Sequence, residues 1–158
     1  ATKMSFIFQS FFVLANETCF DNVSLPLDIA NVSGGERRKK VIAALEAVEL
    51  GDKIKSKAKN LSGGQKQRLA VARAIVNSPK VLFADEPTGN LDSTTGEVIE
   101  DLLFGHTKTN GTTLIIVTHD PDLAEKCDIQ IRIKDGKIES ISEPKKAEIK
   151  KPVTRRIQ

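Results

Sequence analysis

The 158-residue sequence contains no Trp and no Tyr, and its 7 Phe are its only aromatic residues apart from 2 His. Proteins that bind nucleic acid typically combine aromatic platforms with a basic surface. The net charge of +3 is not spread over the chain, because residues 145–158 hold six Lys or Arg and only one Glu. The preceding residues are slightly acidic, so we expect no nucleic-acid partner. We predict that 144–158 is a basic, disordered tail, with weak contact to an anionic membrane surface as the alternative.

The sequence has only two cysteines, Cys19 and Cys127, and no CxxC motif. This predicts reduced thiols in a cytosolic protein and no cysteine-bound metal. No apolar run approaches the length of a membrane-spanning helix, and the longest is short, around 11–15. The first residues, ATKMSF, do not resemble a signal peptide. With 39% hydrophobic residues, the chain is expected to form one domain or part of one, and not to cross a membrane.

The most informative stretch lies between residues 61 and 92 and begins with LSGGQ. Ser62 and Gln65 have the spacing of a capping box at a helix start. Gly63 and Gly64 leave backbone N–H groups uncovered there, so the positive end of the helix could face an anion. An ordinary capped helix that happens to contain two glycines explains LSGGQ alone equally well.

An apolar run at 81–84 follows Pro79 and is typical of a strand buried on both faces of a parallel sheet. Asp85 and Glu86 come directly after it, at the strand end where open α/β sheets bind ligands. In phosphoryl transfer one carboxylate can hold Mg²⁺ while another positions or deprotonates water. Two solvated acids at a strand end are the alternative.

The order of LSGGQ, DE, PTGNLD and Thr118-His119-Asp120 resembles the nucleotide-binding domain of ATP-binding cassette (ABC) ATPases. ADEPTGNLDS most resembles the branch that serves lipoprotein-releasing and macrolide-export permeases. The resemblance implies an α/β fold with a mostly parallel sheet of the P-loop NTPase type, flanked by helices. It also implies a partial ABC domain over 1–143, with a helical subdomain at roughly 16–78 that carries LSGGQ, called here the signature.

The resemblance also implies ATP and Mg²⁺ as ligands and a role for each motif residue. Two such domains pair head to tail, so that the signature of one closes over the nucleotide of the other. By this resemblance, Asp85 binds Mg²⁺ and Glu86 acts as the general base. Gln9 and His119 position the attacking water and the terminal phosphate, and Gln9 also reaches Mg²⁺. The partner's nucleotide is bound by Ser62, Gly63, Gly64 and Gln65, and Asp92 lies at the domain interface.

Several elements can be predicted from periodicity and turn signals. We expect a strand at 5–8 that leads into a loop at Gln9, no helix beyond Pro26, and a helix over 36–50 with Gly51 as its C-terminal cap. Ser93 or Thr94 should cap a helix before a second buried strand at 114–117. A strand at 128–133 and a tight turn should form a hairpin with 138–141. Lys66, Arg68 and Arg73 are expected on a solvated helix face, with proximity to phosphate as the alternative.

The phosphate-binding pattern GxxxxGK followed by Ser or Thr is absent. In the family this loop precedes the segment around Gln9, so we interpret the chain as truncated, with its N-terminal strands missing. The chain alone should bind ATP poorly. The complete protein is expected to be the ATPase of a transporter, paired as a homodimer with a membrane permease at the cytoplasmic face of the cell membrane. A soluble ABC ATPase acting on ribosomes or DNA, or a non-catalytic module that only donates its signature, are the alternatives.

Overall fold

A computed structural model describes residues 3–143 of the chain. These residues belong to two compact units, which divide between His119 and Asp120 and are described separately below. The expected disordered tail, 144–158, lies outside the described residues, and the domain limits expected from the sequence remain a prediction.

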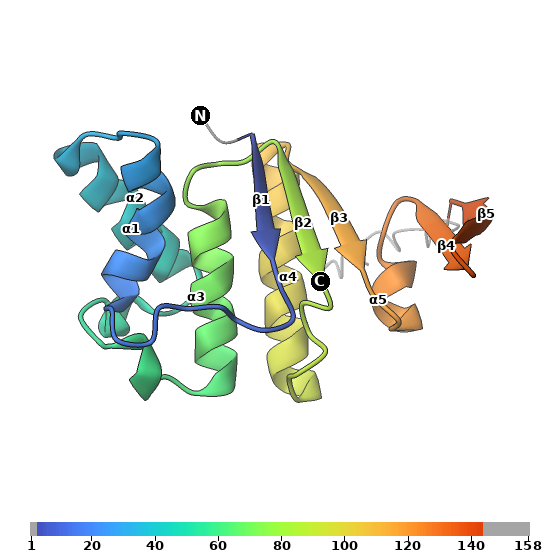
Figure 1. Cartoon of the computed structure of the whole chain (residues 1–158), viewed down its shortest axis with the longest axis horizontal. Helices are drawn as coiled ribbons and strands as arrows, with labels where there is room; N and C mark the ends of the chain where they lie inside the picture. Colours follow the sequence, from blue (N-terminus) through green and yellow to red (C-terminus); the bar gives the residue numbers. More distant parts are fainter. Residues whose placement is uncertain (1–2, 144–158) are drawn as a thin grey trace, which may run out of the picture. The chain divides into compact units, whose positions relative to one another are not determined.

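The first unit is built on a three-stranded parallel sheet (Figure 1). Its strands are β1 (Met4–Ile7), β2 (Val81–Asp85) and β3 (Thr113–Val117), in the order β1-β2-β3. Ile7 is in register with Ala84, and Asp85 with Val117. Because the strands are parallel, their carboxyl ends meet at one edge of the sheet. The segments around Gln9, Glu86 and His119 therefore start from the same edge.

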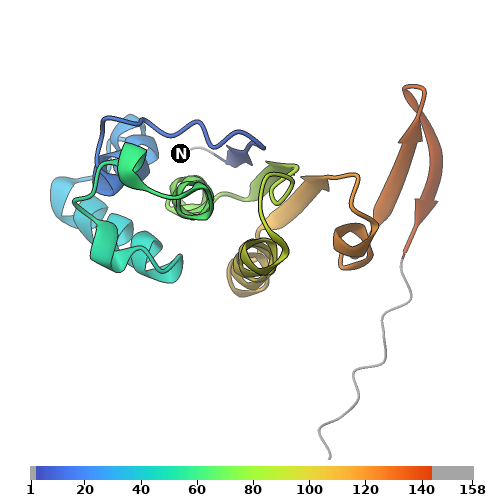
Figure 2. The same cartoon turned by 90° about the horizontal axis from the view of Figure 1, so that it is seen from below.

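Helices cover only one face of this sheet within the first unit. Helices α3 (Gly63–Ile75) and α4 (Ser93–Asn110) run along that face (Figure 2). Strand alternation points Ile7, Leu82 and Ala84 toward them, and all three are buried. On the opposite face Phe6 and Ile115 are 51% and 41% exposed. The expectation that β2 is buried on both faces is therefore wrong for this unit, as is the expectation of a buried strand at 114–117, because no helix within residues 3–119 covers the second face.

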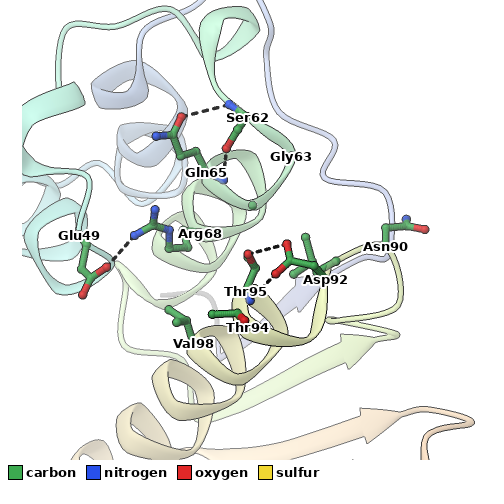
Figure 3. A pocket seen from close by; sticks show the side chains of 12 residues that line it. Glu49, Ser62, Gly63, Gln65, Arg68, Asn90, Asp92, Thr94, Thr95 and Val98 are labelled. Atoms are coloured by element: carbon green, nitrogen blue, oxygen red, sulfur yellow. Dashed lines mark hydrogen bonds and ion pairs between the residues drawn. The ribbon is translucent and has the colours of Figure 1, made fainter.

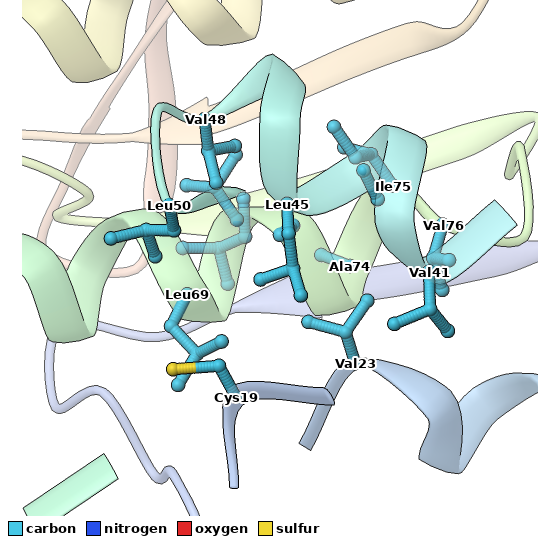
Figure 4. Close-up of a cluster of buried hydrophobic side chains, with 14 of the residues drawn as sticks. Cys19, Val23, Val41, Leu45, Val48, Leu50, Leu69, Ala74, Ile75 and Val76 are labelled. Carbon is cyan, nitrogen blue, oxygen red and sulfur yellow. The ribbon is translucent and has the colours of Figure 1, made fainter. Parts of the chain in front are cut away.

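The remaining helices pack beside α3 and enclose the main hydrophobic core (Figure 4). Helix α1 (Cys19–Ile29) and helix α2 (Gly34–Ala47) each contact α3, and two short 3₁₀ turns, η1 (Gly51–Lys53) and η2 (Ala58–Asn60), follow α2. The largest fully buried apolar side chains contributed by these helices are Val23, Leu27, Val41, Leu45 and Leu69. This core gives α3, the helix that begins with the signature, a fixed position beside the sheet.

Two expected helix ends are wrong. Pro26 lies inside α1, and the helix continues beyond it, with Ala30 N donating to Pro26 O at 3.2 Å. A proline removes one N–H and strains the preceding turn, but contacts between α1 and its neighbouring helices offset this cost. Helix α2 ends at Ala47, because Glu49 adopts the left-handed conformation (φ 57°) expected for glycine and lets Leu50 N bond to Leu45 O.

The described part of the second unit contains helix α5 (Pro121–Glu125) and a hairpin of β4 (Gln130–Lys134) and β5 (Lys137–Ser142). The hairpin is antiparallel and pairs Lys134 with Lys137. Both turn residues, Asp135 and Gly136, have positive φ, as a two-residue type I′ turn requires. The expected hairpin is confirmed, with its first strand displaced toward the turn.

Candidate functional site

Glu86 lies at the carboxyl end of β2, and the segment after β3 holds its carboxylate. The backbone N–H of His119 donates to Glu86 Oε1 at 2.9 Å, and the Thr118 hydroxyl donates to Oε2 at 3.2 Å. His119 Nδ1 lies 2.7 Å from Oε1. The Glu86 side chain is 18% exposed, whereas that of His119 is 84% exposed. The segment after β3 therefore holds the Glu86 carboxylate in place, whereas the His119 side chain is accessible to a ligand.

The backbone of Glu86 is as constrained as its side chain. Its φ of 44° is uncommon for any residue except glycine, asparagine and aspartate. Its N–H donates to Val117 O at 2.9 Å, and its carbonyl accepts from Gly89 N at 3.1 Å. A Cβ on Gly89 would lie 3.3 Å from Gln9 Nε2 and 3.4 Å from Glu86 Cβ. Gln9 Nε2 and Glu86 Cβ therefore both lie close to Gly89, where a larger side chain would meet both.

Asp85 ends β2 beside Glu86 and is exposed. No group of three or more His, Cys, Asp or Glu suited to a metal occurs within residues 3–143. Mg²⁺ on nucleotides is commonly held by one or two carboxylates together with phosphate oxygens and water, so a dedicated protein cage is not required. The accessible Asp85 carboxylate at the end of β2 fits this donor set.

The signature forms the start of α3 as predicted. Ser62 is the N-cap, and its oxygen accepts from Gln65 N at 3.2 Å. Gln65 Oε1 in turn accepts from Ser62 N at 3.0 Å. The capping box is therefore complete. The Ser62 hydroxyl accepts one hydrogen bond and still has its own proton to donate to an anion.

A cavity of about 440 Å³ opens between the start of α3 and the start of α4 (Figure 3). Ser62, Gln65 and Arg68 lie on one side, and Asp92, Thr95 and other α4 residues face them. The two helix starts touch at one point, since a Cβ on Gly64 would come 2.6 Å from Thr95 Cγ2. The full lining consists of Glu49, Ser62, Gly63, Gly64, Gln65, Arg68, Asn90, Leu91, Asp92, Thr94, Thr95 and Val98.

Asp92, not Ser93 or Thr94, is the N-cap of α4, which corrects the sequence-based expectation. Its Oδ1 accepts from Thr95 N at 3.0 Å and its Oδ2 from the Thr95 hydroxyl at 2.8 Å. These hydrogen bonds lower the pKa of the Asp92 carboxyl below its ordinary value. An aspartate is an equally good cap, and its carboxylate is favoured at the positive helix end.

Two of the basic residues of α3 bind other parts of the protein, which corrects their assignment to a solvated face. Arg68 pairs with Glu49 at 2.8 Å and donates to Val48 O at 3.3 Å. Arg73 donates to Phe12 O at 2.8 Å and Phe11 O at 3.3 Å. Burial lowers the pKa of the Arg73 guanidinium, as expected for a cation withdrawn from water.

The segment after Gln9 is attached to the core at several points. Asn90 Nδ2 donates to Gln9 O at 3.1 Å, and the buried Asn22 exchanges two hydrogen bonds with the Leu14 backbone at 2.7 and 3.1 Å. Together with Arg73, these side chains hold the loop in an extended path over α1 and α3.

The structure adds residues that sequence patterns did not indicate. Gln67, in α3, donates from Nε2 to Pro87 O at 2.6 Å and is buried. The contacts of Asn90, in the PTGNLD motif, and of Arg73 also emerge only from the fold, because both side chains donate to backbone carbonyls in the segment from Gln9 to Phe12. A side chain that donates to a carbonyl far away in the sequence has no fixed spacing from that carbonyl. Only the fold therefore reveals such hydrogen bonds.

The fold and site define an ATP-binding cassette ATPase domain, with a parallel sheet of the P-loop NTPase type. A family model described as "ABC transporter" matches residues 1–89, more than half of the chain. The chain therefore belongs to the ABC transporter family, as the ATP-binding domain.

Relatives support this assignment. The chain is 45% identical over 139 residues to the uncharacterized ABC transporter ATP-binding protein YbbA of Escherichia coli (strain K12), covering 88% of this chain and 61% of YbbA. It is 41% identical over 147 residues to the macrolide export ATP-binding/permease protein MacB of Brucella abortus (strain 2308), covering 93% of this chain and 22% of MacB.

A solved structure of similar fold is the dimeric, post-hydrolysis state of the ATP-binding cassette MJ0796 bound to ADP and Pi. The TM-score is 0.81 at 40% identity, and the match covers 91% of this chain and 64% of that one. The chain thus spans about 60% of the length of ATP-binding proteins such as YbbA and MJ0796. No helix within residues 3–143 is long and apolar enough to span a membrane.

Proposed function

We propose that the protein containing this chain is the ATP-binding and ATP-hydrolysing motor of an ABC transporter. The observation that carries the proposal is the arrangement of Glu86 at the end of β2, where Thr118 and His119 fix its carboxylate and the Gln9 amide lies close to Gly89, as Glu86 does. This geometry suits a base that takes a proton from water attacking a terminal phosphate.

Each surrounding residue has a distinct role in this mechanism. The backbone N–H of His119 orients the Glu86 carboxylate, and the exposed imidazole is accessible to a phosphate. Asp85, with Gln9, would hold Mg²⁺, which neutralises phosphate charge when bound. The Gln9 amide lies on the Glu86 side of Gly89, where it can orient the attacking water. Glu86 then accepts the proton that this water releases.

The signature is proposed to bind the nucleotide of a second domain. Ser62, Gly63, Gly64 and Gln65 start α3 with the positive end of its dipole, which attracts phosphate. The solved relative is described as dimeric and bound to ADP and Pi, which supports pairing with a second domain. Asp92 would lie at this interface, where its cap keeps the start of α4 in place.

Coupling to a permease is proposed from the segment that follows Gln9. Phe8 and Phe12 are 44% and 66% exposed and pack edge to face at 5.4 Å, which leaves an apolar surface for a partner. MacB is named as a joined ATP-binding and permease protein, which supports a peripheral location at the cytoplasmic face of the cell membrane. We assign the chain to the macrolide-export and lipoprotein-release branch from its ADEPTGNLDS motif.

The first experiment compares ATP binding and turnover by residues 1–158 with those of a version that includes any polypeptide encoded before Ala1. We expect turnover only in a version that supplies GxxxxGK followed by Ser or Thr, because its amides and lysine hold the phosphates. In that version, Glu86→Gln should lower kcat about 10²–10⁴-fold. Unchanged turnover in Glu86→Gln would contradict the role of Glu86.

A second candidate is a module that donates only its signature. It is favoured by the complete capping box at the start of the signature helix, which residues 62–65 form by themselves. Titration of residues 1–158 into an ABC domain disabled by a signature serine substitution tests donation, and turnover by the version that includes any polypeptide encoded before Ala1 separates the two functions. Rescue without turnover by that version would support the donating module, and turnover by that version would support the motor.

A further inference from the structure

Gln67 is a buried polar residue in α3, just after the signature, and its position in the core is unusual for glutamine. Its side chain is 1% exposed, and Nε2 donates to Pro87 O at 2.6 Å. Its Oε1 has no hydrogen-bond partner within residues 3–143. An apolar side chain of the same length would fill this space without burying an unpaired oxygen. The main role of the Gln67 amide is therefore to donate a hydrogen bond to the Pro87 carbonyl, not to pack α3 against the core.

Pro87 directly follows Glu86, whose backbone conformation is unfavourable for two reasons. Glu86 has a φ of 44°, and the residue before a proline is normally driven toward extended conformations. Such conformations persist only where surrounding contacts determine them. The Glu86 turn, defined here as residues 86–90, is therefore expected to depend on its hydrogen bonds.

Those hydrogen bonds come from two directions. On the sheet side, Val117 O accepts from Glu86 N, and His119 N donates to Glu86 Oε1. On the side of α3, Gln67 holds the carbonyl of the very next residue, Pro87. The Glu86 turn is thus held from β3 and from α3, with Gln67 as the support from α3, and Asn90 at its end donates to Gln9 O.

We propose that Gln67 is a positioning residue that keeps the Glu86 carboxylate in its catalytic orientation. The proposal rests on the proposed function, because it takes Glu86 as the base. Gln67 is one helical turn beyond Gly63, so the same rigid helix start joins the signature to the Glu86 turn. A displacement of α3 on nucleotide binding at the signature would be transmitted to Glu86 through this bond.

The test uses Gln67→Met in the ATP-hydrolysing protein that contains this chain, because methionine keeps the length and removes the donor. Lys66→Met is the control for methionine in α3; the Lys66 side chain has no hydrogen bond or ion pair within residues 3–143. We expect hydrogen exchange of Gly89 N–H, which bonds to Glu86 O, to become about tenfold faster in Gln67→Met only. We expect kcat to fall about tenfold or more with KM for ATP changed less than about threefold.

Unchanged exchange and unchanged kcat in Gln67→Met would overturn the proposal. A double variant tests whether Gln67 acts through Glu86. If it does, Gln67→Met should not lower kcat further in a protein that already carries Glu86→Gln. A further, additive loss of kcat would also overturn the proposal. If Gln67→Met does not fold, wild-type exchange decides: protection of Gly89 N–H equal to that of β2 amides supports the proposal, and free exchange contradicts it. If Glu86→Gln alone retains full turnover, the function of Glu86 fails, while the exchange data still show whether Gln67 holds the turn.

Discussion

Gly64 has no room for a side chain, because a Cβ there would lie 2.6 Å from Thr95 Cγ2. Gly64→Ala should therefore force the starts of α3 and α4 apart and destabilise the protein by about 1–3 kcal/mol. Thermal or denaturant unfolding measures this effect. Gly63→Ala is the matched control, since its nearest neighbour would be Phe11 Cζ at an ordinary 3.9 Å.

A second substitution tests whether the contact with Thr95 causes the loss of stability in Gly64→Ala. Thr95→Ser removes Cγ2 but keeps the hydroxyl that donates to Asp92 at 2.8 Å. Gly64→Ala combined with Thr95→Ser should recover most of the lost stability. A combined variant as unstable as Gly64→Ala would show that the contact with Thr95 is not the reason for glycine. Loss of ATPase activity in the stable Gly63→Ala variant would instead reflect the signature's ligand.

Asp92 gives a pH-dependent contribution to the stability of α4. Hydrogen bonds from Thr95 lower its pKa below the ordinary 3.8, so the native state favours the carboxylate. This stabilisation is fully present above pH 3.8 and is lost as the pH falls through the lower pKa of the folded state. Asp92→Asn keeps an acceptor for Thr95 N but does not titrate.

We therefore expect wild type and Asp92→Asn to converge in melting temperature as the pH is lowered from about 5 to about 2. Circular dichroism on both proteins at each pH provides the measurement, and the difference between them removes the effect of all other acids. A constant difference across this range would mean that the Asp92 carboxylate does not stabilise α4.

At the scale of elements, the Arg73 side chain connects helix α3 to the loop after Gln9. Its guanidinium bonds to the carbonyls of Phe11 and Phe12, and Phe12 has a φ of 43°. Arg73→Met should release this conformation and lower the free energy of unfolding by about 1.5–3 kcal/mol, the usual value for a charged hydrogen-bond donor. Chymotrypsin should then cleave faster at these two phenylalanines.

Arg38→Met is the matched control, because Arg38 is exposed on α2. Equal cleavage rates for wild type and Arg73→Met would show that the loop holds its path without the guanidinium. If Arg73→Lys restores only part of the protection, the two-point contact of the planar guanidinium is the important feature.

The elements show which parts of the structure could be predicted from the sequence. Local chemistry placed the start of α3 at Ser62, the β4–β5 turn and the acids after β2, because caps, turns and apolar runs depend on neighbouring residues. The ends of α1 and α2 could not be predicted, because tertiary contacts override the local preferences of Pro26 inside α1 and of Glu49 after α2. Motif resemblance brought Gln9, Glu86 and His119 together, but Gln67 and Arg73 bind carbonyls far along the chain, which no spacing rule encodes.

At the scale of the whole molecule, we expect one face of the β1-β2-β3 sheet, which no helix within residues 3–119 covers, to affect how residues 1–158 behave in solution. Phe6 stacks on Phe83 at 4.9 Å, and Ile115 and Val117 extend the apolar surface over β3 at 41% and 59% exposure. The chain also spans about 60% of the length of relatives such as YbbA and MJ0796. Patches of this kind and open strand edges promote self-association.

We expect residues 1–158 to bind a hydrophobic dye and to self-associate with rising concentration. Phe6→Thr with Ile115→Thr should reduce both effects while preserving secondary structure, because threonine is also favoured in strands. Leu82→Thr, on the buried face of β2, is the contrasting variant and should instead destabilise the fold by about 2–5 kcal/mol through lost packing and a buried hydroxyl. Sedimentation and dye fluorescence distinguish these cases. A monomer that binds no dye would mean that this face is covered in solution.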